Sequence, residues 1–105
     1  MLRLGRSDVF RHVVMFRWAD GVDDAHVAEV ARRLDELPAA ISEIRSYRHG
    51  VDARVNEGNF DYVVVADFDS ADDYVVYRDH PVHAAFIADA LAGRVADRAA
   101  MQYRC

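Results

Sequence analysis

The chain has 105 residues, 52% of them hydrophobic, which fits one globular domain with one core. Its formal charge is −5, and its 13 basic residues, all arginine, are scattered among acids, so nucleic acid is not an expected partner. No apolar run is long enough to cross a membrane, and residues 1–10 lack the apolar centre of an export signal. Cys105 is the only cysteine, which favours a reducing cytoplasm, and the absence of lysine indicates a GC-rich, bacterial coding bias.

Residues 10–18 are predicted to form the first strand, because apolar residues alternate and β-branched residues are frequent. Both faces of this segment are apolar near its centre. A helix is expected to follow, with Asp23 or Asp24 accepting hydrogen bonds from its free amides. Its apolar stripe consists of Val27, Val30, Ala31, Leu34 and Leu37. Pro38 predicts that this helix ends near Glu36.

Two more strands are expected at residues 44–51 and 60–68, joined by a polar connection. The second of these is the clearest strand in the chain, and it is again apolar on both faces. Residues 70–77 predict a short helix that begins with a capping box at Ser70. Pro81 suits the first position of a further helix, and Gly93 weakens or ends it. The last residues, 99–105, are predicted to form an edge strand.

This order of elements predicts a ferredoxin-like α+β domain with a four-stranded antiparallel sheet. The helices of such a domain cover one face of the sheet. The opposite face would carry four apolar side chains that nothing else in the chain can cover: Val13, Met15, Val63 and Val65. Exposed apolar patches favour association, so we predict a homodimer in which two sheets pack together.

Two histidines are the main candidates for chemistry. His83 lies on the apolar stripe of its helix, and His12 lies on the strand face that carries Phe16. If helices pack on that face, both imidazoles enter one apolar pocket, where loss of solvation favours the neutral form that a general base requires. Tyr77 is placed to supply a hydroxyl to the same pocket. The alternative is that these histidines are hydrogen-bonded core residues without a catalytic role.

The remaining histidines have other expected roles. His80 precedes Pro81 and is expected to cap the helix or face solvent, whereas His26 and His49 are expected at the surface. His80 and His83 are spaced like a pair of metal ligands, but no third or fourth ligand stands at a recognisable spacing. We therefore predict neither a metal nor another cofactor.

Three segments, RHVVMFRW, LDELPAAISEIRSYRHGVD and YRDHPVHAAF, together resemble the stress-responsive A/B-barrel (Dabb) family. The resemblance implies a Dabb domain at residues 10–105, preceded by an N-terminal extension at residues 1–9. It also implies a ferredoxin-like subunit whose sheet packs on that of a partner to form a dimeric α/β barrel. That assembly agrees with the two predicted strands, residues 10–18 and 60–68, that are apolar on both faces.

Members of the family range from plant stress proteins without established catalysis to polyketide cyclases similar to olivetolic acid cyclase. By position, the resemblance implies that His83 is the base of an intramolecular aldol condensation, assisted by Tyr77, with His12 lining the same cavity. Tyr62 stands where the cyclase has a histidine, so the match there is incomplete. Besides the catalytic residues, we expect four side chains to contact substrate: Phe16, Tyr62, His80 and Phe86.

Three functions therefore remain open. The first is a cofactor-free enzyme that acts on an apolar compound with several carbonyl or enol oxygens. The second is a non-catalytic stress-response or ligand-binding dimer. The third is a monooxygenase of the dimeric ferredoxin-like type, cofactor-free or dependent on haem, with Trp18 in its pocket.

Overall fold

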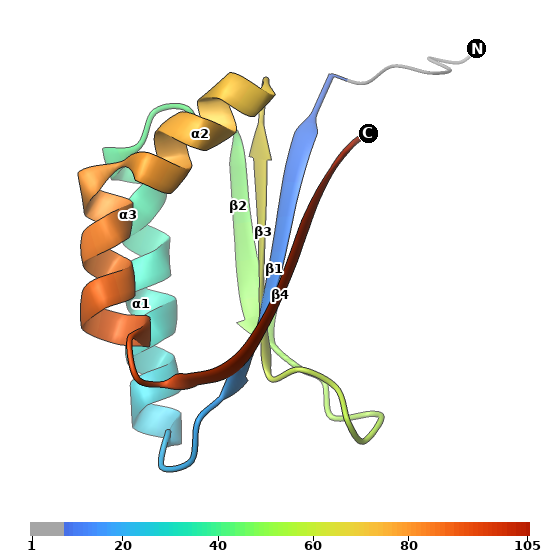
Figure 1. The fold of residues 1–105 in the computed structure, drawn as a ribbon, viewed down its shortest axis with the longest axis vertical. Coiled ribbons are helices and arrows are strands. Elements are labelled where there is room, and N and C mark those ends of the chain that lie inside the picture. Colours follow the sequence, from blue (N-terminus) through green and yellow to red (C-terminus); the bar gives the residue numbers. More distant parts are fainter. Residues whose placement is uncertain (1–7) are drawn as a thin grey trace.

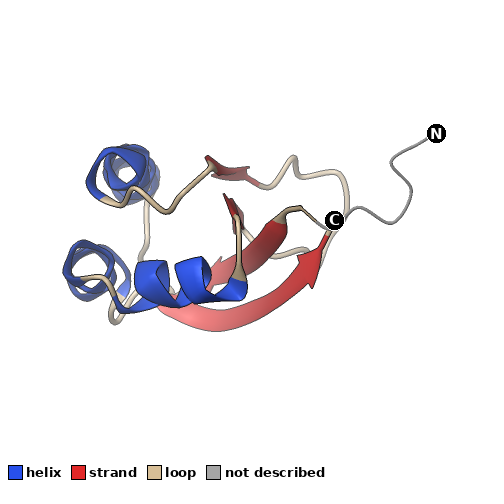
Figure 2. Ribbon diagram, turned by 90° about the horizontal axis from the view of Figure 1, so that it is seen from above, coloured by secondary structure: helices blue, strands red, loops and turns tan. Residues whose placement is uncertain are grey.

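The computed structural model describes residues 8–105, which form four strands and three helices. In chain order these are β1 (Phe10–Trp18), α1 (Asp24–Ala40), β2 (Ser46–Val51), β3 (Tyr62–Phe68), α2 (Ala71–Asp79), α3 (Pro81–Phe86) and β4 (Val95–Arg104). The strands make one antiparallel sheet in the order β2-β3-β1-β4. All three helices lie on the same side of this sheet (Figures 1 and 2). The predicted ferredoxin-like α+β fold is confirmed.

The core lies between the helices and the inner face of the sheet. The even-numbered residues of β3 and of the centre of β1 (residues 12–16) are buried, which confirms the predicted alternation. α1 contributes Val30, Leu34 and Leu37 from its predicted stripe. Each of these three side chains is no more than 2% exposed. The odd-numbered residues of β1 and β3 point to the opposite, outer face, which none of the described helices covers (Figure 2).

The prediction that α1 ends near Glu36 is wrong, because the helix continues through Pro38 to Ala40. Proline removes one amide donor and disfavours helical geometry in the residue before it. Here that cost is offset by burial of Leu37 and Ile41, which are 2% and 0% exposed. The amide of Ile41 closes the helix on the carbonyl of Leu37 at 3.0 Å.

The end of the chain also differs from prediction. After α3 the chain makes a wider helical turn, Ile87–Leu91, closed by the amide of Ala92 on the carbonyl of Ile87. Gly93 then adopts a φ of +78°, which suits glycine, and turns the chain into β4. β4 begins at Val95 instead of residue 99 and pairs with β1 along its length. As predicted, it is an edge strand.

The predicted N-terminal extension, residues 1–9, lies outside the described residues except for its last two. Of these, Val9 exchanges backbone hydrogen bonds with Cys105, which continues the pairing of β1 with β4. Within residues 8–105, no helix is both long enough and apolar enough to span a bilayer.

Candidate functional site

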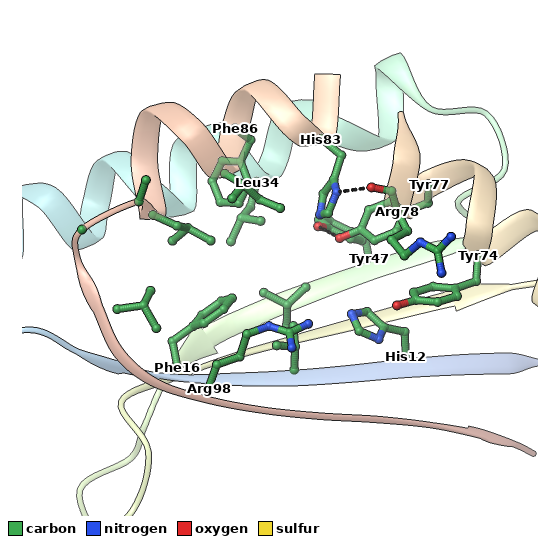
Figure 3. A pocket seen from close by; sticks show the side chains of 17 residues that line it. His12, Phe16, Leu34, Tyr47, Tyr74, Tyr77, Arg78, His83, Phe86 and Arg98 are labelled. Atoms are coloured by element: carbon green, nitrogen blue, oxygen red, sulfur yellow. Dashed lines mark hydrogen bonds between the residues drawn. The ribbon is translucent and has the colours of Figure 1, made fainter. Parts of the chain in front are cut away.

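A cavity of about 430 Å³ opens between α2, α3 and the inner face of the sheet (Figure 3). Its apolar wall includes Val14, Phe16, Leu34, Val64, Phe86, Ile87, Leu91 and Val95. Its polar wall consists of His12, Tyr47, Tyr74, Tyr77, Arg78, His83 and Arg98. The volume lies within the usual range for small-molecule sites, and few polar groups among apolar walls are typical of them.

The structure brings five of the seven predicted site residues to this cavity: His12, Phe16, Tyr77, His83 and Phe86. The other two, Tyr62 and His80, are not part of its lining. The imidazoles of His12 and His83 approach the cavity from opposite sides, His12 from the sheet and His83 from α3 (Figure 3).

The break between α2 and α3 fixes the orientation of His83. Pro81 has no amide hydrogen, and the amide of Val82 donates to Nδ1 of His80, which caps α3 at 3.1 Å. In a continuous helix that amide would donate to the carbonyl of Arg78. The carbonyl instead accepts a hydrogen bond from Nδ1 of His83 at 3.1 Å (Figure 3).

This hydrogen bond also fixes the tautomer of His83. A carbonyl oxygen can only accept, so the neutral ring carries its proton on Nδ1 and a lone pair on Nε2. Burial lowers the pKa of His83, which favours the neutral ring near pH 7. The ring lies 4.3 Å from the ring of Tyr77, between centroids. His83 therefore presents a proton-accepting nitrogen at the cavity.

His12 has the opposite tautomer. Gln102, its neighbour on β4, donates an amide hydrogen to Nδ1 of His12 at 2.9 Å. The neutral ring therefore carries its proton on Nε2. Burial, with smaller effects of Arg98 and His83, lowers the pKa of His12 to about 4. His12 thus presents a hydrogen-bond donor, while His83 presents an acceptor.

Two tyrosines add a further donor. The hydroxyls of Tyr47 and Tyr77 lie 2.8 Å apart. Burial raises the pKa of Tyr77 to about 12 and raises that of Tyr47 further, so both stay protonated near neutral pH. One hydroxyl hydrogen bridges the pair, which leaves the second hydrogen for another acceptor. The sequence indicated Tyr77, but it offered no reason to single out Tyr47.

Tyr62 does not occupy the predicted position. Its hydroxyl lies 2.7 Å from Nδ1 of His49, and Nε2 of His49 lies 2.6 Å from Asp35. The prediction that His49 is a surface residue is therefore wrong, since its side chain is only 11% exposed. His26 is half-buried, with Nε2 2.8 Å from the carbonyl of Ala90, so it too is more than a surface residue.

Trp18, expected in the pocket of a monooxygenase, does not line the cavity. It packs instead against Phe16 and Tyr62. Within residues 8–105, no cluster of three or more histidine, cysteine, aspartate or glutamate side chains is arranged to hold a metal ion.

The fold and the site define a class of protein: ferredoxin-like α+β domains with a cavity between the helices and the sheet. Residues 10–105 match the family model of the stress responsive A/B barrel domain, Dabb. The chain therefore belongs to the Dabb family.

Similar proteins come from plants and bacteria. The chain is 27% identical over 82 residues to a stress-response A/B barrel domain-containing protein of Arabidopsis thaliana, covering 75% of this chain and 71% of that protein. It is 42% identical to a dimeric ferredoxin-like protein from Thermobifida fusca, with a TM-score of 0.85 and coverage of 92% and 91%. A hydroxynitrile lyase from Passiflora edulis is 14% identical, with a TM-score of 0.82 and 95% coverage of both chains, a likeness in fold alone.

Proposed function

We propose that this Dabb protein is a cofactor-free enzyme that removes a proton from carbon next to a carbonyl group, using His83 as the base. The observation that carries the proposal is the pair of opposite tautomers at one cavity. An enolisation needs an acceptor for the carbon-bound hydrogen and a donor for the oxygen that gains charge. His83 and His12 meet these two needs on opposite sides of one space.

The proposed reaction is of the polyketide cyclase-like aldol type. Nε2 of His83 takes the α proton, and the electron pair of the C–H bond forms an enolate whose oxygen accepts a hydrogen bond from Nε2–H of His12. The Tyr47–Tyr77 pair supplies a second donor to the same region. The enolate carbon then attacks another carbonyl carbon of the same molecule, and the resulting alkoxide regains the proton from His83. A C–C bond forms, and the base returns to its starting state.

The cavity wall supports an apolar substrate with more than one oxygen. Aromatic and aliphatic side chains form most of the wall, and a few polar groups provide orientation. A ring-forming reaction also requires a chain that folds back on itself, and water-excluding walls favour such conformers.

Deuterium exchange tests the proposal. A suitable probe is ethyl 2-benzyl-3-oxobutanoate, an aromatic compound with a single proton between two carbonyls. In D₂O, we expect the protein to accelerate loss of this proton by about 10²–10⁴ over an equal concentration of free imidazole, the range typical of a positioned base. NMR follows the signal directly. A rate equal to that of imidazole would contradict the proposed base.

A non-catalytic ligand-binding dimer is the second candidate. It is favoured by the hydrogen bonds that hold each ring, because within residues 8–105 no buried side-chain nitrogen or oxygen lacks a partner. Core histidines without chemistry are held in the same way. The exchange measurement separates the two functions, because a binding protein would take up the probe without accelerating exchange.

We further propose that the subunit forms a homodimer through the outer face of the sheet. Val13 pairs with Val65, and Met15 pairs with Val63, so the four predicted side chains form one continuous patch. Met101 of β4 pairs with Val13 and extends the patch, and it is 60% exposed in the single chain. The similar Thermobifida fusca protein is dimeric. A second copy of the same sheet covers this patch symmetrically.

Met15→Asp is expected to convert the dimer to a monomer. The change places a carboxylate within the apolar patch, where dimer formation would remove it from water at a cost of several kcal/mol. We expect the dissociation constant to rise at least about 100-fold, since each factor of ten corresponds to roughly 1.4 kcal/mol. Sedimentation equilibrium measures the change, and thermal melting verifies the fold.

Val76→Asp is the matched control for this variant. Val76 is 43% exposed on α2, on the helical side of the subunit. This change should leave the association state as it is in the wild type. If Met15→Asp remained dimeric, or if Val76→Asp dissociated, the proposed interface would be wrong.

A further inference from the structure

One arginine of the cavity lining, which is exposed to solvent, has no counterion among the described residues. Arg98 lies on β4 opposite Phe16 of β1, on the inner face, and its guanidinium extends toward the cavity (Figure 3). Among residues 8–105, no carboxylate pairs with this guanidinium. The neighbouring Asp97 accepts a hydrogen bond only from the backbone amide of Arg98.

The second arginine at the cavity differs in this respect. Arg78 makes two hydrogen bonds to Asp79, of 2.8 and 3.0 Å, so its charge is already matched. Arg98 is therefore the cavity cation whose charge and donors remain available.

The cavity wall also lacks acids. The chain has 18 acidic residues against 13 basic ones, yet none of the described residues that line the cavity is aspartate or glutamate. The two imidazoles are neutral near pH 7, because burial lowers the pKa of each. The positive charge of Arg98 contributes to both lowered values, so its field reaches across the cavity. In an acidic protein, the described lining of the cavity thus carries the unpaired positive charge of Arg98 and no aspartate or glutamate.

We propose that the ligand is a small organic anion whose carboxylate pairs with Arg98 while its carbonyl lies between His12 and His83 and its apolar part contacts Phe16 and Phe86. This inference rests on the proposed function and adds the substrate class, an oxo acid. A guanidinium presents two parallel N–H groups that match a carboxylate, so Arg98 fixes both the charge and the orientation of the ligand.

The anion also affects the base. Pairing with Arg98 offsets the positive charge that lowers the pKa of His83, so the bound acid raises that pKa and makes Nε2 a stronger base. A neutral ligand of the same shape leaves the charge in place. The acid and its neutral analogue should thus differ in two ways: in how tightly they bind, and in the pKa that His83 has when they are bound.

The test compares 4-oxo-4-phenylbutanoate with its neutral amide, a matched pair with the same ring and ketone. By calorimetry, we expect the wild-type protein to bind the acid about 10- to 100-fold more tightly than the amide, a preference that added salt reduces. Arg98→Gln should remove this preference and leave the affinity for the amide unchanged. An NMR titration should show a raised pKa of His83 with the acid and not with the amide.

Arg104→Gln is the matched control, because Arg104 lies on the same strand and the same face but over Phe10, outside the cavity. It should retain the preference for the acid. Equal binding of both compounds by the wild type, or an undiminished preference in Arg98→Gln, would overturn the inference and leave proton abstraction from a neutral substrate intact. Binding of neither compound would contradict both the ligand cavity and the inference, whereas preserved acid binding without exchange activity would contradict only the proposed base.

Discussion

Replacing His83 with glutamine is expected to lower the protein-catalysed rate of α-proton exchange by about 10²–10⁴, to the level of free imidazole. Glutamine retains an amide hydrogen that can bond to the carbonyl of Arg78, but it has no basic nitrogen. The loss should therefore appear in the maximal rate while the affinity for the probe changes little. NMR in D₂O measures both quantities.

The pH profile gives a second readout for the same group. The base must be neutral, and burial lowers the pKa of His83 below its ordinary value of 6.5. The rate should therefore fall on the acid side, as Nε2 becomes protonated, with the midpoint of this fall below pH 6.5.

His80→Asn is the control for His83→Gln. His80 caps α3 outside the cavity, and asparagine is a good cap, so this variant should retain both the fold and the rate. An undiminished rate in His83→Gln would show that another group accepts the proton.

Acidification is expected to destabilise the protein through His12 by up to about 3 kcal/mol between pH 6.5 and pH 4. The pKa of His12 is about 4 in the folded protein and has its ordinary value of 6.5 in the unfolded chain, so between these values the unfolded chain binds more protons than the folded one. The contribution of His12 to the free energy of unfolding is therefore fully present above pH 6.5 and is lost as the pH falls toward 4. Urea denaturation at a series of pH values measures the slope.

Several groups, most of them titratable or charged, surround His12, so a variant must show that the acid slope comes from His12 itself. Tyr74 and Tyr77 face it from α2, His83 from α3, and Arg98 and Gln102 from β4. His12→Gln removes the titration and should flatten the acid slope, with His83 contributing a residual slope of the same sign. His80→Asn should retain the full slope. A slope unchanged in His12→Gln would show that His12 does not control acid stability.

The sheet could be predicted where the sequence is strongly periodic. β1 and β3 alternate apolar residues over most of their length, so the sequence assigned each side chain to the correct face. β4 could not be predicted over residues 95–98, because Val95 is followed by Ala96, Asp97 and Arg98, which carry little strand preference. That part of the strand forms because β1 offers it a free edge.

The site could be predicted only in part, for the same reason. His12 and His83 follow from local periodicity. Pairing with β1 brings Arg98 to the cavity and Gln102 to His12, and nothing near them in the sequence indicates that register. Tyr62 was assigned to the substrate by position, but a hydrogen bond to His49 holds it elsewhere. The tautomer of His83 depends on a carbonyl freed by the helix break, which only the geometry reveals.

β4 turns its alternate residues to opposite sides of the sheet. Arg98 and Gln102 lie on the inner face of the sheet, whereas Met101 and Tyr103 lie on the outer face proposed to meet a second copy. Because one strand supplies both surfaces, self-association and ligand uptake form a single thermodynamic cycle. If dimer formation changes the affinity for the ligand by some factor, ligand binding changes the affinity of the two subunits for each other by the same factor. Any such factor other than one makes the measured ligand affinity depend on the protein concentration.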